Sequence, residues 1–173
     1  LEEGLRTIVR GFKHNVKTRG GPVRKPAHRL APAEAELLEK LIAEDMRRGQ
    51  LIRIRSPWGA PAFLTKPAKS GRAEKKRRMV VDYRWVNGVT VRSFFIVPRA
   101  DDQKRHVAGN WFFTLGDGVS GFNQLANTPE ATVILAVVSA SGTYGPSCLT
   151  FGPCNGPEDF QACVNRMFNR RLG

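Results

Sequence analysis

The densest group of chemically active side chains in this sequence lies between residues 66 and 78. Seven of these thirteen residues are basic: Lys66, Lys69, Arg72, Lys75, Lys76, Arg77 and Arg78. Ammonium and guanidinium groups at this density are not buried without partners, so the segment must reach solvent or bind phosphate groups. Strand-forming residues flank it at 62–65 and 79–83, which predicts a β-hairpin with a basic tip.

The positive charge is concentrated in the first half of the chain. The 173 residues contain 28 Lys and Arg against 15 Asp and Glu, a net charge of +13. Residues 1–84 hold 21 basic and 9 acidic groups, a net +12, whereas residues 85–173 hold 7 and 6, a net +1. A field this asymmetric favours a polyanion or an acidic surface as partner. The alternative is a basic face that is only solvated.

Other bulk features exclude several classes of protein. No apolar run is long enough to cross a bilayer, and the longest, residues 133–138, predicts one buried strand. Three cysteines, Cys148, Cys154 and Cys163, are too few and too far apart for a zinc ribbon, and their odd number argues against a disulfide framework. We therefore expect reduced thiols in an intracellular, reducing compartment. The first residue is Leu, so we expect a processed product or an excerpt.

The coarse pattern of the chain predicts an α+β fold. Residues 1–30 hold eight basic side chains and no sustained period, which predicts an extended basic arm that needs a partner to become ordered. A proline at the first helical position, an apolar stripe and a closing glycine predict a helix over 32–49. Residues 112–115 and 133–138 are predicted core strands, and residues 157–172 a final helix.

A series of short motifs covers nearly the whole chain in one order. They are His28-Arg29-Leu30-Ala31-Pro32-Ala33-Glu34, Pro57-Trp58-Gly59-Ala60-Pro61, Arg78-Met79-Val80-Val81-Asp82-Tyr83-Arg84, Asn87, Val89-Thr90, Pro98-Arg99-Ala100-Asp101-Asp102, Gly109, Asp117-Gly118-Val119-Ser120-Gly121-Phe122-Asn123-Gln124, Gly142-Thr143-Tyr144, Phe151-Gly152, Asn155, Pro157 and Phe160-Gln161. This ordered set resembles the reverse transcriptases of gypsy-type LTR retrotransposons. No single motif is decisive, but their order and spacing are very specific.

The resemblance implies part of a right-hand polymerase fold, the fingers plus the N-terminal half of the palm. Residues 1–30 would be the basic arm, 31–108 a fingers-like helix and hairpin, and 109–173 a partial palm. In such enzymes two metal ions held by carboxylates promote phosphoryl transfer. By resemblance, Asp117 is the first metal-binding carboxylate and Phe122 the steric gate beneath the sugar. Lys66 and Arg78 would contact the triphosphate, and Gln161 would lie near the templating base.

Each of these assignments has a simpler structural interpretation. Asp117 follows a glycine and is also compatible with an ordinary turn, and Phe122 with core packing. Arg78 is compatible with one more solvated charge. Asp82, and Asp101 or Asp102, are expected to be structural carboxylates that pair with Arg84 and Arg99. Of the three tryptophans, Trp58, Trp85 and Trp111, at least two are expected to pack rather than to offer stacking faces.

The second metal-binding motif of the family, Tyr-x-Asp-Asp, is absent from the sequence, and no Asp-Asp pair follows residue 102. One carboxylate does not hold two magnesium ions, so we expect no polymerisation by the chain as given. No cofactor is expected in that case, and Mg²⁺ only if the polymerase interpretation holds. Gly118, where the family usually has leucine, and Gly116 flank Asp117 with the weakest strand formers, which also favours relaxed demand on catalysis.

Three functions remain open on the sequence. The first is a catalytically inactive, RNA-binding structural component of a ribonucleoprotein particle such as an organellar ribosome, with RNA and neighbouring proteins as partners. Membranes and small-molecule substrates are not expected, and the mitochondrial matrix is one candidate location. The second is the N-terminal part of an active retrotransposon RNA-directed DNA polymerase, and the third is a subunit held by protein contacts alone. Nucleic acid would be bound by Arg24, Lys25, Arg29, Lys69, Arg72, Lys75, Lys76, Arg77 and Arg78.

Overall fold

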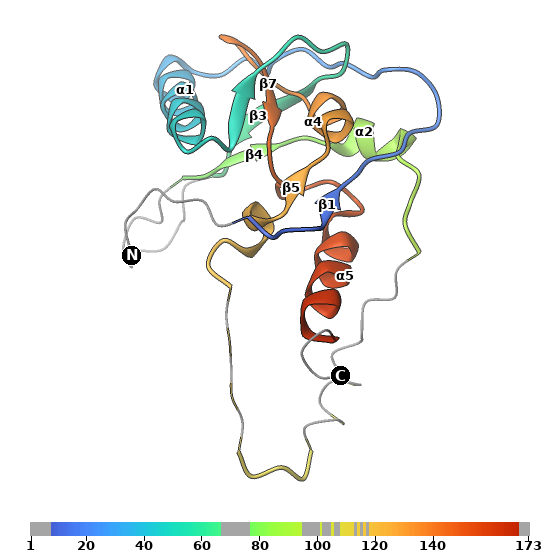
Figure 1. Ribbon diagram of the computed structural model, residues 1–173. Helices are drawn as coiled ribbons and strands as arrows, with labels where there is room; N and C mark the ends of the chain where they lie inside the picture. The colour runs from blue at the N-terminus through green and yellow to red at the C-terminus, as the bar shows by residue number, and fades with distance from the viewer. Residues whose placement is uncertain are drawn as a thin grey trace.

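The computed structural model describes residues 8–66, 77–94, 108–112 and 118–169, together with residues 101, 105, 114 and 116. These residues form a mixed α/β fold around one principal sheet (Figure 1). Strands β2 (Leu51–Arg53), β7 (Gly142–Pro146), β6 (Val137–Ser139), β3 (Ala60–Leu64) and β4 (Met79–Val81) lie side by side in that order. Both predicted units, 31–108 and 109–173, contribute strands, so they share one sheet.

The centre of the sheet joins the two halves of the chain. Strands β3 and β6 run parallel, with Ala60 opposite Val137, whereas the other neighbouring strands are antiparallel. Ala60 and Val137 are each 1% exposed. Because the residues of this pair are far apart in sequence, the sheet forms only when both halves of the chain come together.

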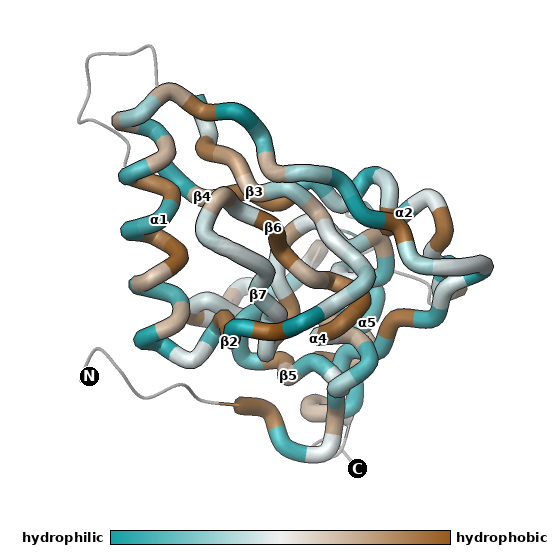
Figure 2. Tube along the Cα trace, turned by 90° about the horizontal axis from the view of Figure 1, so that it is seen from above, coloured by the Kyte–Doolittle hydropathy of each residue, from teal (hydrophilic) through white to brown (hydrophobic). Residues whose placement is uncertain are grey.

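Helix α1 (Pro32–Arg47) confirms the helix predicted over 32–49. Pro32 opens it, and Gly49 follows its end with a φ angle of +66°, donating its backbone N–H to the Met46 carbonyl. The hydrophobic segments of α1, brown in Figure 2, lie on the side toward the strands, and Leu38 and Ile42 are buried in the main core. The apolar stripe therefore anchors α1 to the sheet.

The predicted basic hairpin is confirmed at its two strands. β3 and β4 pair antiparallel, with Ala62 opposite Val81 and Leu64 opposite Met79. Four of the basic residues between these strands lie outside the described residues: Lys69, Arg72, Lys75 and Lys76.

The strand predicted over 133–138 is correct only at its last two residues. Residues 133 and 134 end helix α4 (Pro129–Ile134), and β6 begins at Val137. The Thr128 hydroxyl accepts a hydrogen bond from the Ala131 N–H at 3.2 Å, and proline occupies the first turn. This N-terminal cap imposes a helix on residues whose composition alone favours a strand.

The strand predicted over 112–115 is not found in the part of that segment that the structure describes. Phe112 and Thr114 are outside any strand, and Phe112 is 94% exposed. Residues 113 and 115 lie outside the described set. By contrast, the final predicted helix is confirmed as α5 (Gly156–Asn169), and a further helix, α2 (Arg84–Val89), follows β4.

The predicted N-terminal arm is extended from residue 8 onward, but it packs on the rest of the protein. Strand β1 (Lys13–His14) pairs parallel with β5 (Ala126–Asn127). His14 is fully buried, and its Nδ1 atom lies 2.5 Å from an Asp159 carboxylate oxygen at the start of α5. The expectation that this arm becomes ordered only with a partner is therefore not confirmed.

The contact between α1 and the sheet gives a direct test of the fold. Ile42→Ala removes a side chain that is 1% exposed, so we expect the free energy of unfolding to fall by about 3 kcal/mol. Lys40→Ala, on the exposed side of the same helix, should change it by less than about 0.5 kcal/mol. Urea unfolding followed by circular dichroism measures both. Equal effects of the two substitutions would contradict the placement of α1.

Candidate nucleic-acid interface

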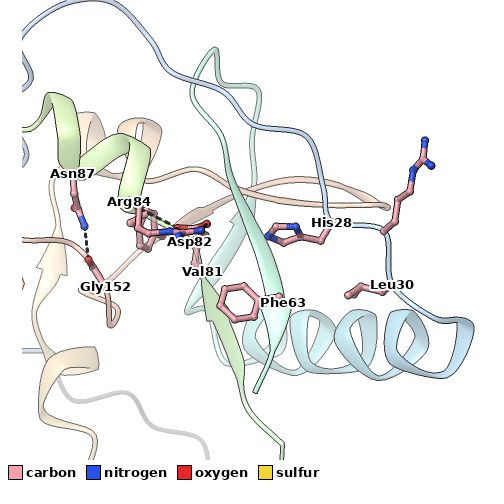
Figure 3. A pocket seen from close by; sticks show the side chains of 10 residues that line it. His28, Leu30, Phe63, Val81, Asp82, Arg84, Asn87 and Gly152 are labelled. Atoms are coloured by element: carbon pink, nitrogen blue, oxygen red, sulfur yellow. Dashed lines mark hydrogen bonds and ion pairs between the residues drawn. The ribbon is translucent and has the colours of Figure 1, made fainter. Parts of the chain in front are cut away.

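A pocket of about 650 Å³ opens where three separate segments meet the end of β4. These segments are the extended chain before α1, the start of α2 and the loop before α5 (Figure 3). Ten residues line the pocket: His28, Arg29, Leu30, Phe63, Val81, Asp82, Tyr83, Arg84, Asn87 and Gly152. The lining combines cationic, aromatic and amide groups, which is the chemistry that binds phosphate and flat rings.

An arginine held by a buried carboxylate forms one wall of the pocket. Asp82 accepts hydrogen bonds from Arg84 Nε at 2.8 Å and Arg84 Nη2 at 2.7 Å. The Asp82 side chain is 8% exposed, whereas that of Arg84 is 84% exposed. The hydrogen bonds from Arg84 hold the pKa of the Asp82 carboxyl below its usual value, against the opposing effect of burial. The predicted pairing of Asp82 with Arg84 is thus confirmed.

The floor of the pocket rests on a buried tyrosine. The Tyr83 hydroxyl donates to the Leu135 carbonyl at 2.9 Å, and burial raises the pKa of this phenol. Gly152 lies against the ring with a φ angle of +115°, and a Cβ atom there would come within 2.9 Å of Tyr83 Cδ2. The Asn87 side chain donates to the Gly152 carbonyl at 2.9 Å and accepts from the Cys154 N–H at 3.0 Å. Position 152 therefore requires glycine.

The opposite wall carries two rings. His28 and Phe63 meet edge to face with their centroids 5.8 Å apart. The His28 ring points toward the Asp82–Arg84 pair (Figure 3). The positions of His28, Phe63 and Gly152 in one pocket were not predicted. In the structure Phe63 is half-buried between buried neighbours in β3.

The basic residues of the extended segment have three different environments. The Arg24 guanidinium donates to protein acceptors: the carbonyls of Ser56 and Trp58 and the Thr143 hydroxyl. The Lys25 ammonium lies 3.9 Å from the centroid of the Trp85 ring. Arg29 is exposed at the pocket. Of the three residues predicted here, Arg29 and Lys25 are the best placed to bind a ligand, since Arg24 already supports the fold.

The three described basic residues next to the hairpin also differ. Arg77 pairs with Glu34 of α1 at 2.6 Å and donates to the Thr65 carbonyl. Arg78 and Lys66 are exposed on the two arms of the hairpin, and Arg78 is held by its backbone N–H, which donates to the Thr65 hydroxyl at 3.0 Å. Their predicted contact with a triphosphate stays a prediction.

The residues assigned to the palm by resemblance are only partly brought together. Phe122 lies in a short 3-10 helix, η1 (Gly121–Gln124), and its ring packs 4.9 Å from those of both Phe151 and Phe160. Gln161 donates to the Asn165 side chain one turn along α5. Because Phe151 precedes Gly152, the aromatic cluster borders the pocket through the backbone. Asp117 lies outside the described residues.

The described part of the chain contains no group of three or more His, Cys, Asp or Glu side chains that could hold a metal ion. Since Asp117 is not among these residues, the predicted role of Mg²⁺ stays a prediction. The predicted pairing of Asp101 or Asp102 with Arg99 also lies outside them, because Arg99 is not described. None of the helices that the structure describes is long and apolar enough to cross a membrane.

Solved structures identify the class of the fold. The foamy viral protease-reverse transcriptase in complex with an RNA/DNA hybrid matches with a TM-score of 0.74 at 19% identity, over 97% of this chain and 22% of that one. The same enzyme in complex with double-stranded DNA matches with a TM-score of 0.69 at 20% identity, over 95% of this chain and 32% of that one. The fold is that of the polymerase part of a reverse transcriptase, as predicted.

Sequence relatives place the chain more closely, although no protein-family model matches it. The retrovirus-related Pol polyprotein from transposon 297 of Drosophila melanogaster is 26% identical over 167 residues, 96% of this chain and 16% of that polyprotein. The enzymatic polyprotein of Cestrum yellow leaf curling virus is 37% identical over 126 residues, 72% of this chain and 19% of that polyprotein. The chain resembles the reverse-transcriptase domains of such polyproteins and spans less than a fifth of either one. The gypsy-type subgroup stays a prediction.

Two glycines test the floor of the pocket. Gly152→Ala forces a side chain into a left-handed backbone conformation against Tyr83, so we expect the protein to lose about 2 kcal/mol of stability. Gly88→Ala in α2 meets no atom within 4 Å and should be neutral or stabilise by about 0.5 kcal/mol. Chemical denaturation of the two variants measures this difference. A Gly152→Ala variant as stable as the wild type would contradict the described packing.

Proposed function

We propose that this chain is the fingers-and-palm segment of a retroelement reverse transcriptase, and that it binds nucleic acid at the pocket beside β4. The observation that carries the proposal is the fixed, outward-facing guanidinium of Arg84 on its buried carboxylate partner, Asp82. Arg29 and His28 lie at the same pocket. The named structural neighbours, which hold an RNA/DNA hybrid and double-stranded DNA, support a nucleic-acid partner.

The arrangement is suited to phosphate because the arginine is oriented before a ligand arrives. Nε and Nη2 of Arg84 are occupied by Asp82, and the remaining guanidinium N–H groups are available to a phosphate oxygen. Since Asp82 already restricts the side chain, binding costs less conformational entropy than it would for a free arginine. The exposed Arg29 can add a second cation to the same backbone. The segment would therefore grip and orient a strand.

Catalysis is expected only if the chain serves a polymerase. By resemblance, Asp117 is the carboxylate that this chain would contribute to a metal site, and bound Mg²⁺ would polarise a primer hydroxyl and steady the leaving phosphate. Phe122, held between Phe151 and Phe160, would present its ring beneath the sugar. Lys66 and Arg78, exposed on the hairpin, would meet the triphosphate.

The role of inactive component in a ribonucleoprotein particle stays a second prediction. The basic surface that favours a polymerase would also serve such a particle, because phosphate contacts alone do not distinguish an active polymerase from an inactive binding protein. The sequence relatives are polyproteins of mobile elements and viruses, which favours the polymerase. The locations and partners expected for a particle, an organellar ribosome and its neighbouring proteins in the mitochondrial matrix, stay tied to this prediction.

Nucleic-acid binding at the pocket predicts a site-specific loss of affinity. Arg29→Gln should weaken binding of a labelled oligonucleotide about 5-fold and reduce the slope of log affinity against log salt by about 1. Arg48→Gln removes the same charge beyond the far end of α1, about 24 Å along the helix from Pro32, and should have little effect. Fluorescence anisotropy at several salt concentrations measures both. Equal losses in the two variants would show that only the total charge matters.

The polymerase and the ribonucleoprotein interpretations predict different behaviour of the native protein. If the chain serves a polymerase, material purified from its source should synthesise DNA on an RNA template, and Asp117→Asn should abolish that synthesis. If it serves a particle, the native protein should sediment with a large complex, be released by ribonuclease and synthesise no DNA. Sedimentation with and without ribonuclease, followed by a primer-extension assay on each fraction, separates the two.

A further inference from the structure

A half-exposed tryptophan with a cation on its ring lies next to the pocket. Trp85 follows Arg84 in the first turn of α2 and is 53% exposed. The Lys25 ammonium lies 3.9 Å from the centroid of its ring. The sequence predicts core or turn packing for at least two of the three tryptophans; in the structure Trp58 is 7% exposed, whereas Trp85 and Trp111 are 53% and 92% exposed. A large aromatic surface at this position remains open to a ligand.

Backbone hydrogen bonds position Lys25 next to the Trp85 ring. The Lys25 N–H donates to the Gly59 carbonyl at 2.9 Å, and the Gly59 N–H donates to the Val23 carbonyl at 3.1 Å. Arg24, between them, is fixed by the Ser56 and Trp58 carbonyls. Gly59 permits this approach, since a Cβ atom there would meet Arg24 Cγ at 2.9 Å. These hydrogen bonds hold the backbone of Lys25 in place, so that only its side chain is left to move.

The backbone that carries the Trp85 ring is anchored in the core. The next residue in α2, Val86, is 1% exposed in the main core, and the Thr90 hydroxyl donates to the Val86 carbonyl at 2.8 Å. Trp85 is thus attached to a helix that is anchored on its other side. The Lys25 ammonium does not cover the whole indole, because about half of Trp85 is still accessible.

We propose that Trp85 and Lys25 form a stacking platform for an unpaired base, and that this platform makes the interface prefer single-stranded nucleic acid over a duplex. The base would stack on the indole, and the Lys25 ammonium would contact the adjoining phosphate. In a duplex the base faces are covered by neighbouring pairs, so the platform has no internal base to accept. Arg29 and Arg84, beside the platform, would bind the phosphates of single strands and duplexes alike. This inference rests on the nucleic-acid binding proposed above and names the form that is bound.

The test compares the affinity for single strands with the affinity for a duplex. Short labelled single strands of DNA and RNA, and a duplex of the same length, are titrated with the 173-residue protein. Trp85→Ala should weaken binding of the single strands about 10-fold and leave duplex binding nearly unchanged. Trp85→Phe, which keeps a flat ring, should retain most of the affinity. Trp111→Ala removes a tryptophan elsewhere that is even more exposed, and it should change neither.

A second measurement does not depend on truncating the side chain. Unlabelled single strands should quench part of the tryptophan fluorescence of the wild type, and that part should be lost in Trp85→Phe but not in Trp111→Phe. DNA and RNA single strands are compared separately, because a difference between them would show whether the sugar contributes. Equal quenching by the duplex would overturn the proposed selectivity.

The outcomes separate the two proposals. If Trp85→Ala weakens single strands and duplex equally, or weakens neither while Arg29→Gln still lowers affinity, the stacking platform is wrong and the phosphate-binding pocket stands. If the wild type binds no nucleic acid at low salt, the proposed function fails and the platform fails with it. Selective loss for single strands, restored by the phenylalanine variant, supports the platform.

Discussion

The buried hydroxyl of Tyr83 is the contact on which the rest of the interface depends. Tyr83 follows β4, and its hydroxyl donates to the carbonyl of residue 135, just before β6, which ties the hairpin in the first half of the chain to the second half. Asp82 and Arg84 are its immediate neighbours, and Gly152 packs on its ring. Because an unpaired phenol is costly to bury, this one hydrogen bond fixes the depth of the ring. The ring in turn sets where the carboxylate, the guanidinium and the glycine loop meet.

The net charge of +13 divides into structural and available cations. Arg24 and Arg77 are committed to protein acceptors, Arg24 on the backbone of residues 56 and 58 and Arg77 on Glu34. Arg29 and Arg78 are exposed. A count of basic residues therefore overstates the binding surface, and the useful distinction is whether a guanidinium already has its acceptors. Arg84 is intermediate, since its partner orients it without hiding it.

The elements that were predictable are those whose signals are local. Pro32, the apolar stripe and Gly49 specify α1 within eighteen residues, and the strand-forming residues on either side of the basic run predict the hairpin. The strand expected over 133–138 failed because a cap at Thr128 decides the conformation five residues later. The strand expected at 112–115 had composition in its favour but no cap, turn or partner that could be read from the sequence.

The candidate site was less predictable because its parts come together only in the fold. The order of the family motifs identified the polymerase fold, and the spacing of Asp82 and Arg84 predicted their pairing. Nothing local places His28 beside residues 82–84, or the glycine of residue 152 beneath them. The hydrogen bonds from Arg24 to residues 56, 58 and 143 are equally non-local. Long-range packing supplies this information, and sequence periodicity does not contain it.

The pairing of His14 with Asp159 has a consequence for how the protein is made. The two residues are 145 positions apart, yet the imidazole is fully buried against the carboxylate, and β1 is completed by a strand at residues 126–127. During synthesis the N-terminal strand leaves the ribosome long before either partner exists. It must therefore wait, unpaired, while α1 and the hairpin form from local contacts. Strand β1, although it is made early, is then among the last segments to reach its native position.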